Sequence, residues 1–119
     1  MADIPALERL LKEIEGHEGV QEAVLVGRSG FHIAGRVPKD VNTETFITMF
    51  AVLLGSAVEV ADTLREQLEA VVIHMERSKV VALTNGPKAL LVLHVGKDVD
   101  VAKLRAKVAT YAGKVEELL

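Results

Sequence analysis

The 119-residue sequence contains no cysteine and no tryptophan, and only one tyrosine and three phenylalanines. Without cysteine there can be no disulfides, no thiolate ligands for metal ions and no thiol catalysis. With few aromatics and a net charge of −3, the chain offers neither a basic face nor stacking rings for nucleic acid. Because no basic leader and no uninterrupted apolar run of ~20 residues is visible, we expect a cytoplasmic protein without membrane insertion.

The composition is that of a folded chain. Half of the residues are hydrophobic, 26% are charged and the mean hydropathy is +0.28, a composition that indicates a folded chain and not an intrinsically disordered one. A chain of this length can bury a core of its own, and it contains no internal repeat, low-complexity segment or linker. We therefore expect one domain spanning residues 1–119.

Motifs for nucleotides and metals are missing. A phosphate-binding loop needs a glycine-rich segment followed by Lys-Ser or Lys-Thr, and the segment Gly27-Arg28-Ser29-Gly30 is better explained as a hairpin turn. The four histidines do not show the i, i+4 spacing of a helical zinc pair; they are His17, His32, His74 and His94. We expect no metal and no cofactor.

Catalytic groupings are not evident either. The serines that could act as nucleophiles are expected in turns or on a helix, and no Ser-His-Asp order stands out; they are Ser29, Ser56 and Ser78. Three arginines are expected near hairpin ends, where a solubilising charge is a simpler explanation than an arginine finger; they are Arg28, Arg36 and Arg77. The sequence predicts a noncatalytic protein, because no convergent polar cluster is visible.

The most informative segment is a long predicted helix from about Thr43 to Gln67. One apolar stripe at helical spacing is expected to cover a sheet; it consists of Phe46, Phe50, Leu53, Ala57, Val60, Leu64 and Leu68. A second apolar arc extends to one side and consists of Ile47, Ala51, Leu54 and Val58. Gly55 lies near Ala51, and both are small enough to let another backbone approach. We expect this arc and Gly55 to form a dimer interface; the alternative is a tight contact within the chain.

The other predicted elements are shorter. They are a first helix through Ile4, Leu7, Leu11 and Ile14, strands at 20–28, 31–35, 69–76, 79–84 and 89–95, and a final helix through Val101, Leu104, Val108, Tyr111, Val115 and Leu118. The strands are apolar on both alternations, so both faces of the sheet must be covered. The order α-β-β-α-β-β-β-α therefore predicts a three-layer α/β/α sandwich with a five-stranded, mainly antiparallel sheet. The long helix lies on one face and the two terminal helices on the other.

This order, with its motifs, resembles the roadblock/dynein light chain family from about Ala6 to Val115. The matching pieces are the first hairpin, Gly19-Val20-Gln21-Glu22-Ala23-Val24-Leu25-Val26-Gly27-Arg28-Ser29-Gly30; the Leu54-Gly55 step; Leu68-Glu69-Ala70-Val71-Val72-Ile73-His74-Met75-Glu76; and Ala89-Leu90-Leu91-Val92-Leu93. The resemblance implies a dimer joined through the long helices and the third strands, and a regulator or scaffold of Ras-like small GTPases.

The resemblance adds further site residues. Val72 and His74 would lie on the dimer-forming third strand, although His74 could equally be a solvated edge residue. The polar side of the long helix would contact a GTPase; its members are Thr48, Glu59, Asp62 and Glu66, for which simple solvation is the alternative. The expected function is a noncatalytic homodimeric regulator or scaffold for a Ras-like small GTPase. The alternative is a structural adaptor subunit of a larger complex without a GTPase contact.

Overall fold

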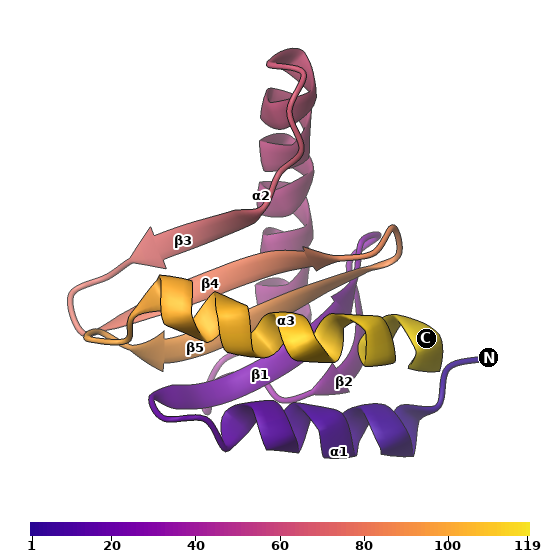
Figure 1. Cartoon of the computed structure of the whole chain (residues 1–119), viewed down its shortest axis with the longest axis vertical. Coiled ribbons are helices and arrows are strands. Elements are labelled where there is room, and N and C mark those ends of the chain that lie inside the picture. Colours follow the sequence, from indigo (N-terminus) through magenta and orange to yellow (C-terminus); the bar gives the residue numbers. More distant parts are fainter.

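A computed structural model describes all residues from 1 to 119. Its elements, in chain order, are α1 (Ile4–Glu15), β1 (Val20–Gly27), β2 (Phe31–Gly35), α2 (Thr43–Thr63), β3 (Ala70–His74), β4 (Ser78–Asn85), β5 (Ala89–Gly96) and α3 (Val101–Leu118). The element order is the predicted one (Figure 1).

All neighbouring strands pair antiparallel in one sheet with the order β2-β1-β5-β4-β3. The sheet therefore has β5 in its centre, with β2 and β3 at the two edges. Leu91 of β5 lies opposite Leu25 on one side and Leu83 on the other. The run of apolar residues in β5 follows from this position, because a central strand between two helical layers has no solvent-facing side.

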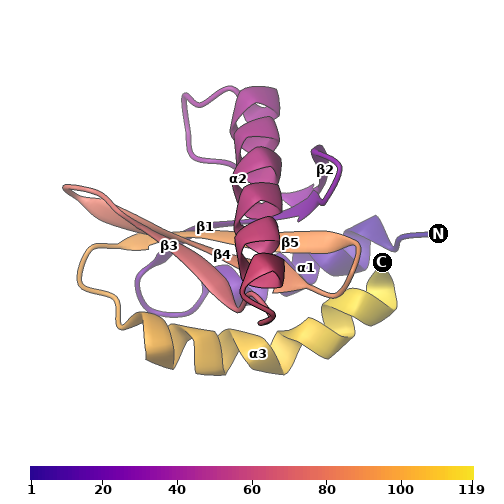
Figure 2. The ribbon, with the colours of Figure 1, turned by 90° about the horizontal axis from the view of Figure 1, so that it is seen from above.

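The helices cover the two faces as predicted. Figure 2 shows α2 on one side of the sheet and α1 with α3 on the other. The core between α1, α3 and the sheet contains 14 buried apolar residues, and the core under α2 contains 9. The three-layer α/β/α sandwich is confirmed, and its two cores are unequal because two helices cover one face and a single helix the other.

The limits of α2 are set by local backbone chemistry. The side chain of Asn42 caps the helix by accepting a hydrogen bond from the Thr45 amide at 2.9 Å. The helix ends at Thr63, four residues before the predicted end at Gln67. It ends because Arg65 adopts a left-handed backbone with φ of 59°, a conformation usually supplied by glycine and not signalled by arginine.

Candidate functional site

The side of α2 that packs on the sheet matches the predicted one only in part: Phe50 is buried in the core under α2, and Phe46 and Leu68 pack against that core. Ile47 and Leu54 are at most 2% exposed and belong, with Phe50, to the core under α2. Their assignment to a dimer interface is therefore wrong, because their side chains are already buried within the chain. The helix is apolar over so wide an arc that periodicity alone defined two stripes without deciding which of them faces the sheet.

A different set of apolar side chains is uncovered. We call Met49, Leu53, Val60 and Leu64 the outer stripe. At 100° per residue these positions lie within about 60° of one another around the helix axis. All four are exposed, Val60 by 60% and Leu64 by 66%. Leu53, Val60 and Leu64 were expected to cover the sheet, and for them that prediction is wrong.

The C-terminal half of α2 reaches past the edge of its own sheet. Figure 1 shows this part of the helix extending beyond β3. The adjacent edge is also free: β3 pairs with β4 alone, and its outer side has no partner strand. On β3, Val72 is half-buried and His74 is exposed. An exposed apolar helix beside an unpaired strand edge is the kind of surface that proteins cover with another chain.

The composition of α2 agrees with a helix that has apolar side chains both on the sheet and on its exposed side. With 21 residues, α2 is long enough and apolar enough to cross a membrane, judged by length and composition only. Its most apolar 18-residue window has a mean hydropathy of 1.6, and only 17% of that window is buried. Glu44, Glu59 and Asp62 interrupt α2, so it is not an uninterrupted apolar run, although it meets the criterion of length and composition. A helix that packs on its own sheet and against a second surface has the same composition, so one such helix is weak evidence for a membrane span.

The opposite flank of α2 borders a cavity of about 360 Å³. It is lined by Arg28, Ala51, Leu54, Gly55, Val58, Glu59, Asp62 and Leu90. A Cβ atom added at Gly55 would meet no atom within 4 Å, so the packing of this chain does not require glycine there. Arg28, directly after β1, donates a hydrogen bond to the carbonyl oxygen of Gly86 in the β4–β5 turn at 3.2 Å.

The structure thus brings together residues predicted for two different interfaces. Ala51, Gly55 and Val58, expected against a second copy, share this cavity with Glu59 and Asp62, expected against a GTPase. Thr48 is exposed and lines a separate hollow nearer the start of α2. Glu66 is exposed in the segment after the helix.

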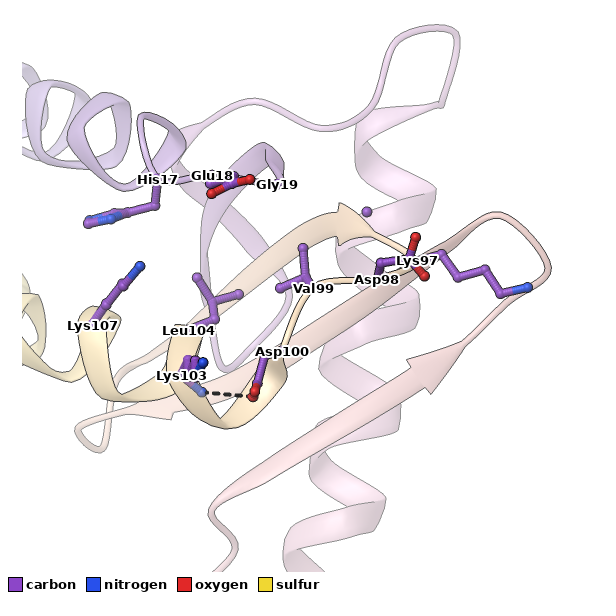
Figure 3. A pocket seen from close by; sticks show the side chains of 11 residues that line it. His17, Glu18, Gly19, Lys97, Asp98, Val99, Asp100, Lys103, Leu104 and Lys107 are labelled. Atoms are coloured by element: carbon purple, nitrogen blue, oxygen red, sulfur yellow. Dashed lines mark hydrogen bonds between the residues drawn. The ribbon is translucent and has the colours of Figure 1, made fainter.

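A second cavity, of about 450 Å³, lies where α1 leads into β1 and β5 leads into α3 (Figure 3). Besides His17 it is lined by charged residues of both signs; they are Glu18, Lys97, Asp98, Asp100, Lys103 and Lys107. Asp100 caps α3 by accepting from the Lys103 amide at 3.1 Å, and His17 bonds to the hydroxyl of Tyr111 at 3.0 Å. Its three carboxylates and three lysines balance in charge, so the cavity does not favour a ligand of one sign.

The histidines do not converge. His32 and His94 lie on β2 and β5, which β1 separates, as predicted. No group of three histidine, aspartate or glutamate side chains is placed to hold a metal ion.

The domain is thus a three-layer sandwich that leaves the outer stripe of α2 and the edge of β3 uncovered. The Roadblock/LC7 domain model matches residues 6–94, and the chain belongs to this family. The uncharacterized protein MJ0310 of Methanocaldococcus jannaschii is 27% identical over 113 residues, covering 94% of this chain and 98% of its own.

Solved structures similar to this chain include MglB proteins. MglB in a tetrameric arrangement is 26% identical with a TM-score of 0.80, covering 93% of this chain and 88% of its own. Myxococcus xanthus MglB is similar in fold, with a TM-score of 0.87 at 12% identity, covering 98% of this chain and 99% of its own. Membership of this family supports a regulatory or adaptor role.

Proposed function

We propose that the protein is a homodimeric, noncatalytic regulator or scaffold for a Ras-like small GTPase. The observation that carries the proposal is the outer stripe, four exposed apolar side chains on a helix whose other side already covers its own sheet. The family resemblance supplies the class of partner. A protein that binds a GTPase needs no phosphate-binding loop of its own, and the sequence contains none.

The second copy would cover the outer stripe and the free edge of β3. Pairing of two β3 strands satisfies the unpaired backbone groups of both edges and gives one sheet across the dimer. The part of α2 that extends past β3 would then lie over the partner's sheet, where its exposed leucine and valine side chains are buried. A two-fold axis beside β3 makes the two contacts identical, as in most homodimers.

The GTPase would bind at the polar flank of α2, around the cavity that contains Glu59 and Asp62. These two carboxylates lie three residues apart on the helix and are both exposed. Two copies of this flank beside a two-fold axis offer a surface of the size of a standard interface, about 800 Å² per partner. The alternative, an adaptor that joins larger complexes, would use the same dimer without a nucleotide-dependent contact.

Reversing the charge of both carboxylates tests the location of the contact. Glu59→Arg combined with Asp62→Arg should weaken the complex with a Ras-like GTPase at least about tenfold, because like charges would replace complementary ones at the contact. Isothermal titration calorimetry against a Ras-like small GTPase, loaded with GTP or with GDP, measures the change. The unmutated protein should show no binding of GTP alone.

The matched control is Glu13→Arg combined with Glu117→Arg. It makes the same change of net charge on two exposed side chains of α1 and α3, on the opposite layer. If the unmutated protein, the Glu59→Arg/Asp62→Arg variant and the control variant bound the GTPase with equal affinity, the contact would lie elsewhere. Tight binding of free GTP would contradict the proposal. Equal affinity for the GTP-loaded and the GDP-loaded GTPase would favour the adaptor role.

A further inference from the structure

The 360 Å³ cavity beside α2 is lined by charged side chains that have no ionic partner within the chain. Arg28, Glu59 and Asp62 are all exposed, and none of them belongs to any of the ion pairs of the structure. The guanidinium of Arg28 donates to the carbonyl oxygen of Gly86 instead. Charges of both signs are therefore available at this cavity to another molecule.

The two carboxylates lie at the end of α2 where the helix itself does not favour them. A helix carries partial negative charge at its C-terminal end, so cations stabilise that end and anions do not. Asp62 is next to Thr63, the last residue of α2, Glu59 is one turn earlier, and the last turn contains no basic residue. Positive charge on a partner would relieve this repulsion, so the carboxylates favour a basic partner.

Between the charged groups the cavity is apolar and open. Ala51, Leu54 and Val58 line it from α2, and Leu90 lines it from β5. A Cβ atom at Gly55 would meet nothing within 4 Å, and this residue is exposed. Glycine within a helix lowers stability relative to alanine, and no contact within this chain compensates for that loss. The bare backbone at Gly55 lets an apolar side chain of a partner approach closely.

The spacing of these groups along α2 suits a helix. From Ala51 to Asp62 the flank is about 16 Å long, which is three turns at 1.5 Å per residue. An amphipathic helix that binds in an apolar groove places its anchors at intervals of three, four and seven residues. Such a helix lying along α2 would meet small residues at Ala51 and Gly55 and then the two carboxylates.

We propose that this cavity receives an amphipathic helix of the partner GTPase. An apolar side chain of that helix fills the cavity beside Gly55, basic side chains pair with Glu59 and Asp62, and an acidic side chain pairs with Arg28 on the sheet side. The inference rests on the proposed function, because it names the part of the GTPase that makes the contact. Opposite charges on the two sides of the cavity fix the orientation of the bound helix.

Gly55→Leu tests the occupant of the cavity. The leucine side chain begins in open space, so the fold should be kept, and the loss of a helix glycine should raise the thermal midpoint of unfolding. The affinity for the GTP-loaded GTPase of the charge-reversal test should fall at least about tenfold, because the side chain occupies the space that the partner needs. Calorimetry measures the affinity.

Gly113→Leu is the matched control. Gly113 is an exposed glycine inside α3, and a Cβ atom there would also meet nothing within 4 Å. It lies on the opposite layer of the domain. The substitution should raise the thermal midpoint in the same way and leave the affinity for the GTPase unchanged.

Arg28→Glu tests the orientation of the bound helix. Reversing this charge should weaken the complex at least about fivefold, because two acidic groups would then face each other. Arg9→Glu makes the same change of charge on an exposed residue of α1 and should leave the affinity unchanged. Circular dichroism checks that both variants keep the fold.

The outcomes separate this inference from the proposed function. Unchanged affinity of Gly55→Leu, together with a loss for Glu59→Arg/Asp62→Arg, would overturn the inference and leave the proposed function in place. A monomer of Gly55→Leu in sedimentation velocity would also overturn it, because a second copy of the chain would then be the occupant. Absence of GTPase binding by the unmutated protein would overturn both.

Discussion

Leu91→Ala is expected to lower the free energy of unfolding by about 2–5 kcal/mol, the cost of leaving a cavity where a buried leucine was. Leu91 is 2% exposed in the central strand and belongs to the core that α1 and α3 cover. Its two cross-strand neighbours are held on both sides by further strands. The surrounding side chains therefore have little freedom to close the space. Urea denaturation at a fixed protein concentration measures the loss.

Val41→Ala provides the control, because Val41 is an exposed apolar residue in the loop before α2. Its truncation should change the free energy of unfolding by no more than about 0.5 kcal/mol. A loss below about 1 kcal/mol for Leu91→Ala would be incompatible with a central, fully covered β5. The fixed concentration matters, since self-association would add to the stability of both proteins.

Val60→Glu is expected to convert the dimer to monomer at micromolar concentration. Val60 belongs to the outer stripe and is exposed in the single chain, so a glutamate there leaves the fold intact. In a symmetric dimer the substitution places two carboxylates in the interface. An uncompensated buried charge costs about 3–5 kcal/mol, and each 1.4 kcal/mol is tenfold in the dissociation constant. We expect a rise of roughly 100-fold or more, measured by sedimentation velocity.

Thr48→Glu is the matched control on the same helix. Thr48 is exposed on the polar flank, on the other side of α2 from the outer stripe. The added charge is the same, and the dissociation constant should change by less than about threefold. If Val60→Glu and Thr48→Glu behaved alike, the outer stripe would not be the interface.

Much of the fold could be predicted from the sequence. Apolar residues on both alternations of the strands implied cover on both faces, and the element order implied a five-stranded, mainly antiparallel sheet. The apolar run around Leu91 agrees with the central place of β5 in the sheet. These features follow from local patterns that tertiary contacts reinforce.

The rotation of α2 could not be predicted. Ile47 and Leu54 lie about 120° from the Leu53 and Val60 side of the helix, and all four are aliphatic. A hydrophobic pattern identifies the sheet-facing side only when the remaining side is polar, and on α2 the apolar arc covers both. The structure resolves this by burying Ile47 and Leu54 and leaving Leu53 and Val60 exposed.

The hydrogen bonds that join His94 to Glu22 and Ser78 could not be predicted for a related reason. They depend on strand register: Ser78 is opposite Gly96 on β5, and His94 is its diagonal neighbour. The bulge before Glu22 then decides which β1 side chain meets the histidine. The sequence identified the strands but carried no signal for a register shift of one residue.

The central claim is that a second copy of the chain covers the outer stripe of α2. Multi-angle light scattering on the unmutated protein at micromolar concentration tests this claim directly. A mass of about twice the 12.9 kDa of the chain is the predicted result. A mass equal to that of one chain would contradict the account, because the exposed side of α2 and the free edge of β3 would then be open to water.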